Sequence, residues 1–114
     1  MFTIDQLNDF GADTKEGLSR CMGMEALYLR LVGMMEKDTH MAELKAALDK
    51  NDLQAAFEAA HALKGVLANL SLTPVLKPIS EMTELLRART DTDYTALYKE
   101  AERQMTALIS LIQS

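Results

Sequence analysis

The sequence predicts an all-α protein: an antiparallel up-and-down four-helix bundle with short extra helices at its N-terminus. Of its 114 residues only five are glycine and two are proline, and helix-favouring Ala, Leu, Met, Glu and Lys fill much of the rest. Apolar residues recur at helical spacing in segments that short polar breaks separate. No alternating run of β-branched and aromatic residues indicates a strand.

The N-terminal third predicts short helices. Thr3 and Gln6 resemble a capping box that opens a helix to Phe10, which ends near Gly11. A second apolar repeat runs from Met24 to Met35. Its positions are Met24, Leu27, Tyr28, Leu31, Met34 and Met35. We expect the methionines on apolar stripes to pack in the core, namely Met24, Met34, Met35, Met82 and Met105.

Two further helices follow, each after a polar break. Asp38 can cap a helix whose inner face lies within residues 41–48. Asn51 is expected to cap the next, with Gln54 three residues later. This helix carries an apolar stripe of about five turns, made of Leu53, Ala56, Phe57, Ala60, Leu63, Leu67 and Leu70.

The last two helices complete the bundle. Thr73 is expected as a cap, with Pro74 at the first helical position. Pro78 lacks an N–H, so it either kinks this helix in its second turn or places the regular start near Lys77. After a break at residues 90–91, apolar residues at helical spacing run from Tyr94 to Ile112.

Composition excludes several classes of function. The chain carries 17 acidic against 12 basic residues, a net charge of −5, which argues against a nucleic-acid partner. No apolar run approaches the roughly 20 residues that span a bilayer, and no secretory signal follows Met1. We therefore expect a cytoplasmic, stand-alone protein with no membrane partner, forming a single domain over residues 1–114.

Few residues could carry chemistry. Cys21 is the only cysteine, and His40 and His61 are the only histidines. The two histidines lie twenty-one residues apart with no patterned carboxylates, so we expect no metal site. No Gly-rich phosphate loop precedes a helix either. His40 is expected to be an exposed residue at a helix start, and Cys21 a small apolar filler.

His61 differs because of its neighbours on the helix. It lies about 100° around the helix from Ala60 on the core stripe, at the margin of the buried face, and should be reachable from solvent. Lys64 is one turn away, while Gly65 and Ala68 keep the adjacent surface low. A glycine inside a helix costs about 1 kcal/mol relative to alanine. A second protein that must approach His61 closely is a reason for the chain to tolerate that cost. The alternative interpretation is an ordinary histidine at the boundary of the buried face, beside a glycine that the helix merely tolerates.

The segment His61–Gly65, HALKG, continued by Ala68-Asn69-Leu70, resembles the signature of histidine-containing phosphotransfer (HPt) domains. The resemblance covers most of the chain, including residues 17–28, 55–60 and 84–86. It implies a four-helix bundle that carries phosphoryl groups in two-component phosphorelays and is not an enzyme with its own nucleotide site. Its implied partners are response-regulator receiver domains and a hybrid sensor histidine kinase.

The resemblance also implies roles for individual residues. His61 would accept the phosphoryl group from a receiver aspartyl phosphate and pass it to another receiver, while Lys64 would offset its charge. Gly65, Ala68, Phe57 and Gln54 would belong to the docking surface. No cofactor is implied on this chain, since Mg²⁺ would be bound by the receiver. Ser71 stands where many members have glycine and, with Pro78, leaves the geometry after the histidine helix open.

Two alternative functions remain at this stage. One is an HPt-like helical docking or regulatory module that no longer carries phosphate, although such a module need not retain His61, Lys64 and Gly65. The other is the dimerising phosphoacceptor part of a sensor kinase. That part would have an acidic residue after the histidine, where this chain has Ala62. We expect a monomer, because a complete four-helix bundle needs no second chain.

Overall fold

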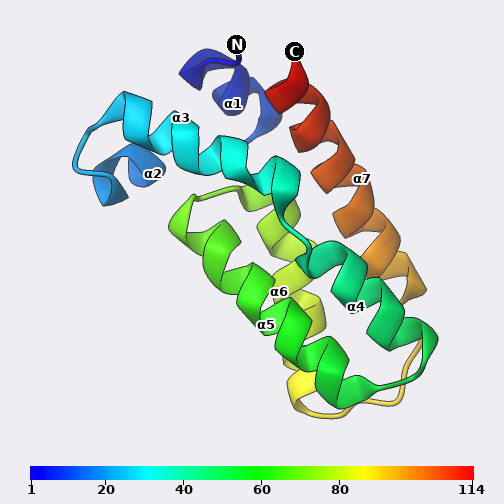
Figure 1. The fold of residues 1–114 in the computed structure, drawn as a ribbon. Helices are drawn as coiled ribbons and strands as arrows, with labels where there is room; N and C mark the ends of the chain where they lie inside the picture. The colour runs from blue at the N-terminus through cyan, green and yellow to red at the C-terminus, as the bar shows by residue number, and fades with distance from the viewer.

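The computed structural model describes residues 1–114 and contains helices without strands (Figure 1). The elements are α1 (Ile4–Phe10), α2 (Thr14–Arg20), α3 (Glu25–Gly33), a 3₁₀ turn η1 (Met34–Lys37), α4 (His40–Asp49), α5 (Leu53–Asn69), α6 (Thr73–Arg87) and α7 (Thr95–Gln113).

Helices α4 to α7 form the predicted antiparallel bundle. They alternate in direction, with α5 packed between α4 and α6, and α6 packed between α5 and α7. Helices α1 to α3 lie at one end of the bundle, where the two chain termini also lie (Figure 1). One cluster of buried apolar side chains extends from Phe2 to Leu108. None of the helices is both long and apolar enough to cross a membrane.

The N-terminal third departs from the sequence prediction. Helix α2 was not predicted, because Leu18 is the only large apolar residue within it. The predicted helix over residues 24–35 ends at Gly33, and η1 follows. Met24 and Met34 are 53% and 62% exposed, so their predicted packing in the core is wrong. Met24 precedes the first turn of α3, and the tighter 3₁₀ turn takes Met34 off the helical stripe. Met35, Met82 and Met105 are buried as expected.

Helix starts were predicted with mixed success. The capping box of Thr3 and Gln6 is present. The cap of α5 is Asp52, whose side chain accepts a hydrogen bond from the Ala55 N–H, so the prediction of Asn51 is wrong. Asn51 instead turns the chain with a positive φ of 55°. An Asp52 carboxylate serves the cap equally well, which is why the sequence alone did not separate the two.

Asp38 and Thr73 were also predicted one residue away from the true caps. Thr39 is the N-cap residue of α4, and the Asp38 carboxylate accepts a hydrogen bond from the His40 N–H. Leu72 precedes α6, so Thr73 is already helical. Helix α6 runs through Pro78, which excludes a regular start near Lys77.

Tyr28 of α3 fastens the N-terminal helices to the end of α5. Its side chain is fully buried, and its hydroxyl donates a hydrogen bond to the Leu70 carbonyl at 2.8 Å. That carbonyl lies at the C-cap of α5, where helix carbonyls lack a partner within the helix. The ring fits against α2 because residue 17 is glycine: a Cβ there would lie 2.5 Å from the Tyr28 ring.

Ser71 ends α5 in a conformation that glycine favours. Its φ is 54°, and it occupies the left-handed position of a Schellman motif. In this motif the Ser71 N–H donates to Ala68 and the Leu72 N–H donates to Leu67. The Ser71 hydroxyl is buried without a hydrogen-bond partner. Serine therefore adopts the helix end that glycine favours, but at a cost in stability.

Replacing Tyr28 by Phe should lower the free energy of unfolding by about 1–3 kcal/mol, because the Leu70 carbonyl would lose its donor. Burial raises the pKa of Tyr28 from 10.0 to about 12. The unfolded phenol ionises first, so this contribution is complete below pH 10 and is lost as the pH rises through 12. In urea unfolding between about pH 9 and 12, the free energy of unfolding should fall less steeply with pH for Tyr28→Phe than for wild type. Equal slopes would show that Tyr28 does not contribute to the pH dependence.

Ser71→Gly should raise the free energy of unfolding by about 1 kcal/mol, because glycine adopts a positive φ without steric strain. Ser71→Ala is the matched control, since it removes the unpaired hydroxyl but retains a Cβ at the left-handed position. Thermal and urea unfolding should place Ser71→Gly above Ser71→Ala. The opposite order would refute the assignment of strain to the backbone.

Candidate functional site

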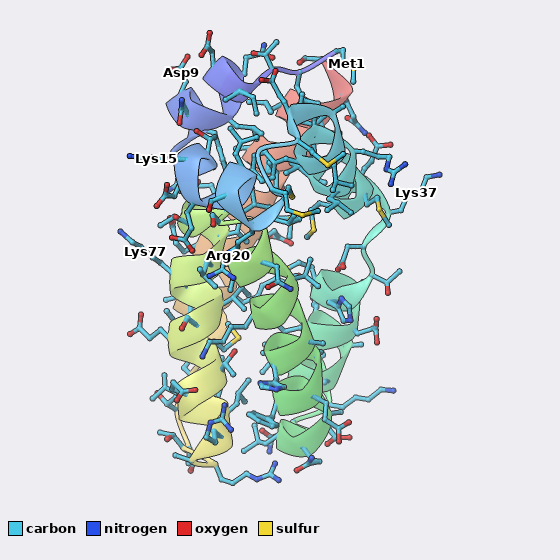
Figure 2. The ribbon with its side chains drawn as sticks, turned by 90° about the vertical axis from the view of Figure 1, so that its left-hand side faces the viewer. Met1, Asp9, Lys15, Arg20, Lys37 and Lys77 are labelled. Atoms are coloured by element: carbon cyan, nitrogen blue, oxygen red, sulfur yellow. The ribbon has the colours of Figure 1, made fainter.

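Helix α5 presents His61 on the outer surface of the bundle. Its other faces are buried through Ala56, Ala60, Leu63 and Leu67, while His61 is exposed. Figure 2 shows α5 and α6 side by side on one face of the molecule. The exposure of His61 agrees with its predicted place at the margin of the buried face.

An aromatic stack holds the imidazole. The rings of Phe57 and His61 have centroids 5.5 Å apart and are inclined by 18°. The Arg87 guanidinium, from α6, lies over the Phe57 ring, with its carbon 5.0 Å from the centroid. The side-chain hydrogen bonds of α5 involve Gln54, and none involves His61. Apolar stacking therefore orients the ring and leaves its nitrogens free.

Lys64 is held towards α6. Its ammonium lies 3.8 Å from the Oε2 atom of Glu84, and its side chain is 32% exposed. The same Oε2 atom lies 3.3 Å from the Nε atom of Arg87. One carboxylate thus faces two cations beside the helix turn that carries His61. These side chains of α5 and α6 form one cluster beside the histidine. We call it the His61 cluster, and its members are His61, Phe57, Lys64, Glu84 and Arg87.

The surface beyond His61 is low, as the small residues predicted. A Cβ at Gly65 would meet nothing within 4 Å, so no contact inside the chain requires glycine there. Ala68 is half-buried in the next turn. Gln54 is different, because it lies two turns before His61 and is already engaged. Its side chain donates to Glu58 and accepts from Arg89.

Sequence reasoning missed the parts that Glu84 and Arg87 take in the cluster. Their spacing of three residues does predict an ion pair on one helix. The placement of that pair against Lys64 and Phe57 depends on how α6 lies against α5, which periodicity within one helix does not contain.

The remaining candidates lie apart from this cluster. His40 contacts the Asp38 carboxylate through its Nδ1 atom at 3.0 Å and does not join His61. Cys21 is buried in the core. No group of three or more His, Cys, Asp or Glu side chains could hold a metal ion.

The fold and the exposed histidine of α5 define a class of protein. A model of the Hpt domain matches residues 29–113, and the chain belongs to this family. It is thus a histidine phosphotransfer protein of phosphorelays, a class of phosphoryl carriers that work with receiver and kinase partners.

A solved structure agrees with this class. The chain is similar to the histidine-containing phosphotransfer protein B (HptB) from Pseudomonas aeruginosa PAO1, with a TM-score of 0.77 and 26% identity. The similarity covers 90% of each chain. No curated protein matches by sequence.

Proposed function

We propose that His61 is the phosphoryl-accepting residue of this phosphotransfer protein, and that residues 1–114 act as one monomeric Hpt-type domain. The observation that carries the proposal is the exposed imidazole of His61, whose nitrogens are free and which stacks on Phe57 beside Lys64. The continuous core from Phe2 to Leu108 supports a single domain.

The reaction needs little from this chain beyond a nucleophile and charge. The Nε2 lone pair of neutral His61, with the ring proton on Nδ1, attacks phosphorus in a receiver aspartyl phosphate. An N–P bond forms as the P–O bond to the aspartate breaks, and the electron pair of that bond stays with the carboxylate. The reverse step returns the group to a receiver.

The other residues have supporting roles in this proposal. Lys64, one helical turn from His61, would balance part of the phosphoryl charge, and Arg87 would add a second positive charge from its place over the Phe57 ring. The receiver supplies the reacting aspartate and Mg²⁺, so this chain needs neither a nucleotide site nor a cofactor. Gly65, Ala68 and Phe57 form the low, partly apolar surface on which the receiver rests, with Gln54 at its edge.

His61→Gln should abolish phosphoryl acceptance and leave the bundle folded, because His61 is exposed and lies outside the core. A receiver charged with a labelled small-molecule phosphodonor is mixed with the chain, and acid-labile, base-stable label is measured. His40→Gln is the matched control and should label like wild type. Label retained by His61→Gln would refute the site. No label on wild type from several receivers that still bind would favour the docking module instead.

Gly65→Leu should weaken receiver binding about tenfold or more, because a large side chain would rise beside His61 where a partner must approach. Ala62→Leu is the control: Ala62 is exposed on the same helix, about 100° around it from His61. Titration calorimetry with the receiver measures both dissociation constants. Gly65→Ala should meanwhile stabilise the fold by up to about 1 kcal/mol. Unchanged affinity of Gly65→Leu would refute the access argument.

A further inference from the structure

Glu84 is an acidic residue in a place where a phosphoryl carrier needs positive charge. Its Oε2 atom lies 3.8 Å from the Lys64 ammonium and 3.3 Å from the Arg87 Nε atom. The Lys64 side chain is 32% exposed, so part of its length packs against the bundle. In the unphosphorylated protein both cations of the His61 cluster therefore already have a counterion.

Both cations belong to the His61 cluster, on the same face of α5 and α6 as the imidazole. Lys64 is one helical turn from His61 on α5. Arg87 lies over the Phe57 ring, which stacks on the imidazole. A phosphoryl group brings about two negative charges. Without Glu84 the two cations would balance that charge; with Glu84 the cluster retains only one net positive charge.

We propose that Glu84 is an internal counterion that competes with the phosphoryl group on His61 for Lys64 and Arg87. This inference rests on the proposed function of His61. Phosphorylation draws the two cations away from Glu84, and that lost pairing makes the phosphohistidine less stable. When the phosphoryl group leaves, Glu84 regains both partners. Glu84 thus favours onward transfer and keeps the carrier from retaining its cargo.

The expected size of the effect of Glu84 on the transfer equilibrium follows from the exposure of its side chain. The Glu84 side chain is 57% exposed, and ion pairs of this kind contribute modestly in water. Removing its charge should shift the transfer equilibrium towards phosphohistidine by roughly two- to fivefold, which corresponds to the upper part of the range for exposed pairs. Salt at about 1 M should suppress the shift, because the screening length falls to about 3 Å.

The test is reversible phosphoryl exchange between the full chain and one receiver, measured as the equilibrium ratio of phosphohistidine to aspartyl phosphate. Glu84→Gln retains the shape of the side chain and removes its charge, and it should raise the ratio by the stated factor at low salt. Glu81→Gln is the matched control. Glu81 is exposed on the same helix but faces the groove towards Leu97 of α7, and its variant should leave the ratio unchanged.

A double-mutant cycle identifies the partner of Glu84. In a Lys64→Ala background the effect of Glu84→Gln on the ratio should shrink, because Glu84 and the phosphoryl group then compete for one cation instead of two. An unchanged ratio for Glu84→Gln, or a shift that persists at about 1 M salt, would overturn the counterion role. Failure of the proposed function is distinct from both outcomes, since wild type would then take no label at His61 at all.

Discussion

The site depends on how closely α5 packs between its two neighbours. Three alanines, Ala56, Ala59 and Ala60, are buried along α5, and small side chains at helix contacts allow helix axes to approach more closely. Contact with α4 on one side and with α6 on the other leaves α5 one solvent-exposed stripe, and His61 lies on it. The same packing brings side chains of α6 against those of α5, so that Lys64 reaches Glu84. The chemical surroundings of the histidine are therefore a consequence of helix packing.

The N-terminal helices stabilise the end of α5 that follows the site. The Tyr28 hydroxyl satisfies the Leu70 carbonyl, and the Schellman motif at Ser71 satisfies two more carbonyls of the last turn. A helix end with satisfied carbonyls frays less. This matters for Gly65, because glycine weakens the helix less than two turns before this end. The exposed surface thus relies on caps and buried hydrogen bonds at a distance from the histidine.

Features that depend on periodicity within a single helix could be predicted from the sequence, and contacts between helices could not. The repeat around His61 predicted its exposure because 3.6-residue geometry acts within one helix. The predicted bundle is likewise present, since the apolar stripes of α5 to α7 are long. The short N-terminal elements were harder: residues 14–20 hold one large apolar residue, and the 3₁₀ turn at Met34 breaks the stripe. The contact of α6 with the site required the structure, because nothing in the α5 repeat specifies which residues of α6 lie beside it.

The way in which the imidazole of His61 is held bears on its proposed use as the phosphoryl acceptor. Histidines that bind metals or act as bases are commonly oriented by a hydrogen bond to one ring nitrogen, which selects one tautomer. His61 is oriented by stacking on Phe57 instead. Stacking restricts the ring plane but fixes no proton, so the tautomer with a free Nε2 lone pair is available without breaking a bond. A carrier must accept and release the same group through one nitrogen, and a ring free of hydrogen bonds suits both directions. In the proposed role of Glu84, the charged partners Lys64, Glu84 and Arg87 then set how long the phosphoryl group stays.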